Sequence, residues 1–217
     1  ITTTLYGHDI ARPWWRQSSN SAQRPNDRSD PTCAGMDNLE SGCGIEGRVR
    51  RYQVLGIESR ASRPLLFSQL AGTLDIGARV HRETQERQQI NGATHLSRTA
   101  GPASNVGSGI VEDNRRTTDA VAGWVQARVG TERLTVTPGL RVEHIDITRL
   151  NRRPVPDGPE GVFGETTLTE LIPGLGATFR ATSTVTLFAG THRGFSPPRN
   201  EDIISNTTGG AVELSPE

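Results

Sequence analysis

Residues 134–143 read Leu-Thr-Val-Thr-Pro-Gly-Leu-Arg-Val-Glu, an unbroken alternation of apolar and polar positions. Successive side chains of a β-strand point to opposite faces of the sheet. The alternation therefore predicts a strand with one apolar face and one face of Thr, Gly, Arg and Glu.

The same two-residue period returns along the chain. It is clear in Leu74–His81, Val121–Val129, Leu171–Phe179 and Thr184–Gly190, and weaker in Ile1–Arg12 and Arg48–Ser59. No segment shows the 3.6-residue stripe of an amphipathic helix. The sequence therefore predicts an all-β fold of about seven strands.

Short and long connections alternate between these strands. Gly130–Arg133 and Ala181–Ser183 are short, and Arg60–Gln69 is of medium length. The long polar stretches are Arg16–Glu46, Glu83–Asp113, Arg149–Thr166 and Ser196–Glu217. A soluble antiparallel sandwich produces the same strand alternation, but a compact soluble domain seldom carries several long loops. Outer-membrane barrels combine short turns at one end with long loops at the other. The loop lengths favour an antiparallel up-and-down meander within a transmembrane barrel.

The amino-acid composition further limits the classes of protein to which the chain can belong. The 217 residues carry 24 basic and 24 acidic side chains, and 33% of them are hydrophobic. No apolar run reaches the 18 residues that a membrane-spanning helix needs, and zero net charge gives no bulk attraction to nucleic acid. Every basic residue is Arg. Because the chain starts without Met and stops without a closing element, we expect an internal piece of a longer protein.

No catalytic or metal-binding pattern stands out. The nucleophile motif GxSxG is absent. The five histidines, His8, His81, His95, His144 and His192, show no metal-ligand spacing with one another or with the cysteines. We therefore expect neither an enzyme, nor a metal site, nor a bound cofactor.

Several motifs resemble those of the TonB-dependent outer-membrane receptors. They are Trp124-Val125-Gln126 followed by the 134–143 strand, Leu171-Ile172-Pro173-Gly174-Leu175-Gly176, and Glu213-Leu214-Ser215-Pro216-Glu217. Within that family the stretch Thr137–Ile145 is most similar to receptors of the ferric dicitrate type. The order and spacing of the motifs carry the resemblance, which covers most of the chain from about Arg48 onward.

The resemblance implies a section of a 22-stranded transmembrane barrel in the bacterial outer membrane. Residues 1–217 would be a partial barrel domain, with the plug domain and the C-terminal strands absent. The implied partners are a ferric siderophore, the TonB–ExbB–ExbD complex acting through the missing plug, and outer-membrane lipid and lipopolysaccharide. Such a piece is not expected to transport anything alone. The competing hypothesis is a soluble or surface β-sheet module that binds a ligand or acts as an adhesin.

Arginines near the long loops are the candidate ligand-binding residues. Planar guanidinium groups bind carboxylates with two parallel hydrogen bonds, which suits an anionic ferric chelate. The candidates are Arg82, Arg87, Arg115, Arg116 and Arg199. The alternative is that each is simply solvated or binds lipopolysaccharide phosphate.

The two cysteines, Cys33 and Cys43, lie in one polar, Gly-rich loop. An outer-membrane protein folds in an oxidising compartment, where disulfides persist. The barrel interpretation therefore predicts a Cys33–Cys43 disulfide that pins the tip of this loop.

Overall fold

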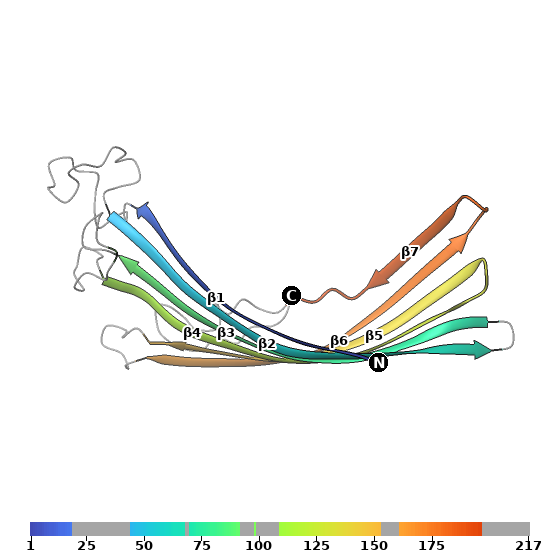
Figure 1. Cartoon of the computed structure of the whole chain (residues 1–217), viewed down its shortest axis with the longest axis horizontal. Coiled ribbons are helices and arrows are strands. Elements are labelled where there is room, and N and C mark those ends of the chain that lie inside the picture. Colours follow the sequence, from blue (N-terminus) through green and yellow to red (C-terminus); the bar gives the residue numbers. More distant parts are fainter. Residues whose placement is uncertain (19–43, 68–69, 92–97, 99–108, 153–160, 197–217) are drawn as a thin grey trace.

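The computed structural model describes residues 1–18, 44–67, 70–91, 98, 109–152 and 161–196. Over these residues the fold is one seven-stranded antiparallel sheet in which each strand pairs with the next along the chain (Figure 1). The strands are β1 (Thr2–Ser18), β2 (Gly44–Phe67), β3 (Leu70–Asn91), β4 (Gly109–Gly130), β5 (Leu134–Asn151), β6 (Val162–Arg180) and β7 (Thr186–His192). The predicted all-β meander is confirmed.

The two ends of the sheet differ in their connections. At the short-turn end, three residues join β4 to β5 and five join β6 to β7. The β4–β5 turn closes with Thr131 N donating to Leu134 O at 2.8 Å. Its Thr131 hydroxyl accepts from the backbone N–H groups of Arg133 and Leu134, a usual role for Thr in turns. The opposite end, where β1–β2, β3–β4 and β5–β6 are joined by longer segments, is called the long-loop end.

The strands run further toward the long-loop end than the apolar pattern predicted. Residues 60–67, expected in a connection, extend β2 at the opposite, short-turn end. At the long-loop end, residues 83–91 and 109–113, expected in a loop, continue the pairing of β3 with β4. In this half both faces of the sheet carry polar residues. Arg82 of β3, for example, faces Asp119 of the neighbouring strand β4. The backbone pairing continues there, although the sequence shows no alternation of apolar and polar residues that would predict it.

The sheet curves strongly and so has a concave and a convex face (Figure 1). The segment that follows β7 lies inside the curve (Figure 1), and its Phe195 packs against Ala120, Ile145 and Ile147. These three residues therefore identify the concave face, and the strand register extends that assignment across the sheet. Facing residues of β4 and β5, such as Gln126 and Gly139, lie on the same side.

The convex face carries an apolar band over the half of the strands nearest the short-turn end. Its middle is formed by Ile76, Val125 and Leu140, which face one another on β3, β4 and β5 and are all exposed. The band includes Leu5, Ile57, Leu74, Val80, Val121, Val129, Val136, Val142, Leu171, Leu175, Phe179 and Leu187.

Beyond the band the convex face becomes polar within two residues on several strands. Arg82 follows Val80, Asp119 lies next to Val121, and His144 follows Val142. A contiguous exposed apolar surface of this size marks an interaction with a membrane or a protein. Among the residues described, no helix is long and apolar enough to cross a membrane.

Candidate functional site

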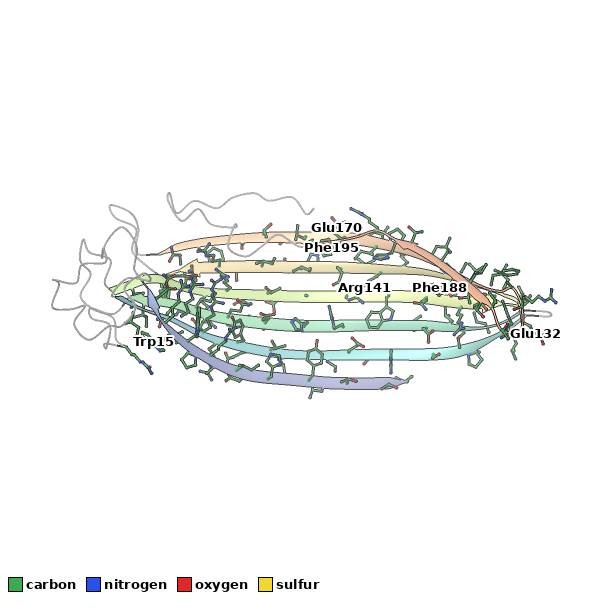
Figure 2. The ribbon with its side chains drawn as sticks, turned by 90° about the horizontal axis from the view of Figure 1, so that it is seen from above. Trp15, Glu132, Arg141, Glu170, Phe188 and Phe195 are labelled. Atoms are coloured by element: carbon green, nitrogen blue, oxygen red, sulfur yellow. The ribbon has the colours of Figure 1, made fainter. Side chains whose placement is uncertain are left out.

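The middle of the concave face is a wall of compensated charges. Arg141 Nε donates to Glu143 Oε1 at 2.6 Å, and Arg79 Nη2 lies 3.9 Å from the same oxygen. The Arg141 guanidinium also lies over the Trp124 ring, 5.1 Å from its centroid. The prediction that Arg141 and Glu143 share a face agrees with this geometry, and Figure 2 places Arg141 at mid-sheet.

A second ionic cluster lies where β1 and β2 reach the long-loop end. Glu46, whose side chain is nearly buried, accepts from Arg16 Nη2 at 2.9 Å and from Arg48 Nε at 2.5 Å. Both guanidiniums also lie over the Trp14 ring, at 5.4 and 5.8 Å from its centroid. Burial alone would raise the pKa of Glu46, but the hydrogen bonds from Arg48 and Arg16 outweigh it and lower the pKa. The cluster ties the two strands together at the base of the first long connection.

Glu46→Gln is expected to destabilise the full-length receptor by about 1 kcal/mol, because one charge-assisted contact with each arginine is lost. A lowered pKa means that the pairing stabilises the fold above the ordinary value of 4.5 and that this stability disappears as the pH falls through the lowered pKa. Denaturant unfolding of the wild type and the variant at pH 7 and pH 3 measures the loss of unfolding free energy and its dependence on pH. A variant as stable as the wild type at pH 7, or a difference that grows at pH 3, would contradict the assignment.

Three arginines gather on the concave face of β3, β4 and β5 at the long-loop end. Arg87 and Arg116 lie 3.5 and 3.6 Å from Glu112 Oε1, and Arg149 Nε donates to Asn114 Oδ1 at 2.9 Å. The Asn114 amide in turn donates to Glu112 at 3.0 Å. Arg116 and Arg149 face each other across the strands and are almost fully buried. Glu112 therefore contacts two of these cations directly and is linked to the third through Asn114.

The structure separates the arginines that the sequence grouped together. Arg82 and Arg115 lie on the convex face, 3.5 Å from Asp119 and from Glu86, and more than half of each side chain is exposed. Arg87 and Arg116 lie on the concave face. All four belong to strands rather than loops. Arg199, Cys33 and Cys43 lie outside the described residues.

Sequence reasoning missed Arg12, Arg50 and Arg149, which are also on the concave face. The alternation of side chains along a strand could have predicted these faces, because adjacent residues such as Arg115 and Arg116 point to opposite sides of the sheet. A loop was expected at the long-loop end, so this alternation was not applied to the arginines there.

The model of the family "TonB dependent receptor-like, beta-barrel" matches residues 3–217. The chain belongs to the TonB-dependent receptor family. The crystal structure of the ferric citrate transporter FecA in the unliganded form is 26% identical, with a TM-score of 0.59 over 71% of this chain. The match covers 22% of the FecA chain, so this chain spans about a fifth of that protein.

Membership of the TonB-dependent receptor family places this sheet in the bacterial outer membrane, as the sequence predicted. The seven strands form an unclosed section of a TonB-dependent receptor barrel. The convex apolar band then faces lipid, and the concave wall faces the lumen. The soluble β-sheet module considered from the sequence is not supported, because the family and FecA are receptors and transporters.

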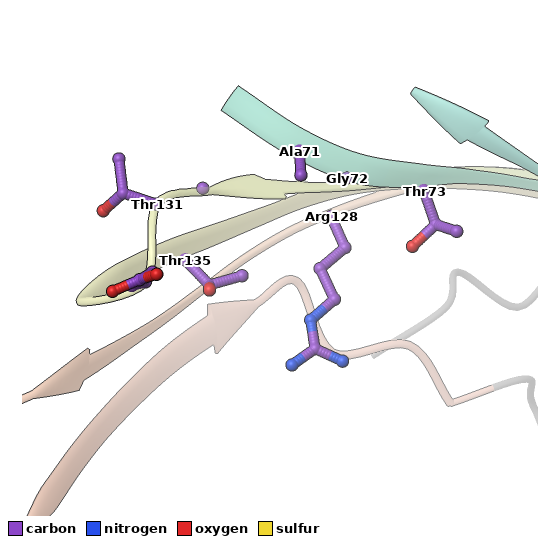
Figure 3. Close-up of a pocket in the computed structure, with 8 residues that line it drawn as sticks. Ala71, Gly72, Thr73, Arg128, Thr131 and Thr135 are labelled. Atoms are coloured by element: carbon purple, nitrogen blue, oxygen red, sulfur yellow. The ribbon is translucent and has the colours of Figure 1, made fainter. Parts of the chain in front are cut away.

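A shallow hollow of about 480 Å³ lies at the short-turn end of this TonB-dependent receptor section (Figure 3). It is lined by Thr73, Arg128, Thr135 and neighbouring residues. In the described part of the chain Arg128 contacts no carboxylate. The hollow lies at the opposite end of the strands from the arginine assembly, so the two are separate features. Nor does any group of three or more His, Cys, Asp or Glu among the described residues lie where it could hold a metal ion.

Proposed function

We propose that the intact receptor takes up an anionic ferric siderophore, of which a ferric citrate-like chelate is the leading candidate. The observation that carries this proposal is the assembly of Arg87, Arg116 and Arg149 on the lumen wall at the long-loop end. In outer-membrane barrels the long loops are extracellular, so this is the end at which a ligand arrives. The 26% identity to a ferric citrate transporter supports the same ligand class.

The chemistry of the assembly suits an iron chelate whose outer surface displays carboxylates. A guanidinium group offers five N–H donors in a fixed plane and binds a carboxylate with two of them. Glu112 and Asn114 hold the three arginines in place before a ligand arrives, which reduces the entropy lost on binding. Because the three arginine side chains are largely buried, each contact that they make with a ligand is stronger than it would be in water.

Uptake is proposed to follow the pattern implied by the family resemblance. Ligand binds at the extracellular side, a plug domain rearranges, and the TonB–ExbB–ExbD complex supplies work from the periplasmic side. Outer-membrane lipid and lipopolysaccharide would surround the convex face. The proposed site therefore consists of Arg87 and Arg116 from the sequence-based candidates, with Arg149 added by the structure. Arg82 and Arg115, which point outward, are candidates for lipopolysaccharide phosphate instead.

Arg87→Gln and Arg116→Gln in the full-length receptor are each expected to weaken ferric citrate binding about tenfold or more, since a hydrogen bond to a charged group contributes about 1.5–3 kcal/mol. Equilibrium binding to purified receptor and uptake of radioactive iron by cells measure the effect. Arg115→Gln is the matched control, because Arg115 is the neighbour of Arg116 and lies on the opposite face. Unchanged binding in both concave variants, or equal loss in the control, would contradict the proposal.

A further inference from the structure

Arg12, Arg50 and Arg87 form a row across the concave face of three neighbouring strands. The register places Arg12 of β1 directly opposite Arg50 of β2, and Arg50 directly opposite Arg87 of β3. Directly opposite residues of antiparallel strands have Cβ atoms roughly 5 Å apart. Three guanidinium groups therefore share one stripe of the wall at the long-loop end.

Such a row is unfavourable unless something neutralises it, because like charges directly opposite each other destabilise a sheet. Glu112 lies beside Arg87. Within the described residues, no carboxylate contacts Arg12 or Arg50. The nearby arginines Arg16 and Arg48, on the same face of the same two strands, are both paired with Glu46. Among the described residues, Arg12 and Arg50 are thus two adjacent cations on the lumen wall that no carboxylate contacts, whereas Glu46 is engaged by Arg16 and Arg48.

We infer that Arg12 and Arg50 form a second anion subsite, continuous with the assembly around Arg87 and Arg116. This inference rests on the proposed function and specifies its ligand. Adjacent strands lie about 4.8 Å apart, so the row from Arg12 to Arg87 spans roughly 10 Å. A ligand that uses both ends of the row carries at least two anionic groups separated by up to that distance. The substrate class is therefore a multiply charged polycarboxylate chelate rather than a neutral one.

The experiment measures the Kd of purified full-length receptor for ferric citrate and for a neutral ferric trihydroxamate chelate. The variants are Arg12→Gln and Arg50→Gln. Two controls remove one arginine each from outside the row. Arg51→Gln changes the neighbour of Arg50 on the convex face, where it pairs with Asp9, and Arg128→Gln changes a concave arginine at the opposite end.

Arg12→Gln and Arg50→Gln are each expected to raise the Kd for ferric citrate about tenfold and to flatten its dependence on ionic strength. Both controls should stay within about twofold of the wild type. If Arg87→Gln and Arg116→Gln weaken binding but Arg12→Gln and Arg50→Gln do not, the second subsite is wrong and the proposed function stands. If the wild type does not bind ferric citrate, or binds the neutral chelate more tightly, the proposed function fails and the inference fails with it.

Discussion

Val125→Arg is expected to destabilise the full-length receptor in its membrane by about 2–4 kcal/mol, the cost of an arginine at mid-depth on the lipid face of a barrel. Val125 lies at the centre of the convex band, flanked across the strands by Ile76 and Leu140. An arginine there has no route to water along the strand without crossing other apolar side chains. Urea titration of the receptor refolded into lipid vesicles measures the loss, and outer-membrane fractionation shows the accompanying fall in assembled protein.

Gln126→Arg is the matched control, because residue 126 is adjacent in sequence and lies on the lumen wall near the Arg141 and Glu143 charges. It should change the unfolding free energy by less than about 1 kcal/mol. The lipid-face assignment would be lost if Val125→Arg inserted and resisted urea as well as Gln126→Arg does.

Gly77→Ala is expected to destabilise the receptor by about 1–3 kcal/mol through overpacking. A Cβ at this position would overlap Cζ2 of Trp124, so the indole could not keep its place across the glycine. Displacing the ring also removes the Arg141 guanidinium from its face. The free energy of unfolding and the tryptophan emission spectrum of the full-length receptor both report the change.

Gly123→Ala provides the comparison, since Gly123 faces Ala78 on the neighbouring strand and a Cβ there would meet only the Gly77 carbonyl oxygen, at 4.0 Å. Its effect should fall within about 0.5 kcal/mol of zero. Equal stability of the two alanine variants would show that Trp124 does not occupy the space above Gly77.

The half of the sheet near the short turns was predictable because lipid and lumen impose opposite demands on alternate residues. Leu140 and Arg141 had to face opposite sides wherever the strand lay, and the β4–β5 turn fixed the direction of both strands. The face assignment follows from that constraint, and the alternation of short turns and long loops added the barrel class. The family resemblance, carried by the same strands, agrees with the match over residues 3–217.

The long-loop half was not predictable in the same way because its convex face leaves the apolar band. There Asp9 pairs with Arg51, and His144 contacts Thr169 and Asp146. In this half the concave face is apolar at Ile145, Ile147 and Leu168, whereas in the short-turn half the convex face is the apolar one. With no hydrophobic period to follow, residues 83–91 read as loop.

The candidate site was only partly predictable for the same reason. Arg82, Arg87, Arg115 and Arg116 all seemed to be loop arginines, although strand parity sends two outward and two inward. Arg12 and Arg50 are 38 residues apart in sequence and meet only through the register of β1 with β2. Cross-strand partners separated by a long connection cannot be read from one strand alone.

The assignment of lipid to the convex face is tested most directly by the accessibility of successive β4 residues to oxygen and to water in the intact receptor. Spin labels placed singly at residues 121–127, in a background with Cys33→Ser and Cys43→Ser, are examined in lipid vesicles for collisions with oxygen and with a water-soluble nickel chelate. A lipid-facing convex surface predicts a two-residue period, with oxygen favoured at Val121, Gly123, Val125 and Ala127 and disfavoured at the even positions between them. Absence of that period, or the opposite phase, would contradict a barrel wall with lipid on its convex face.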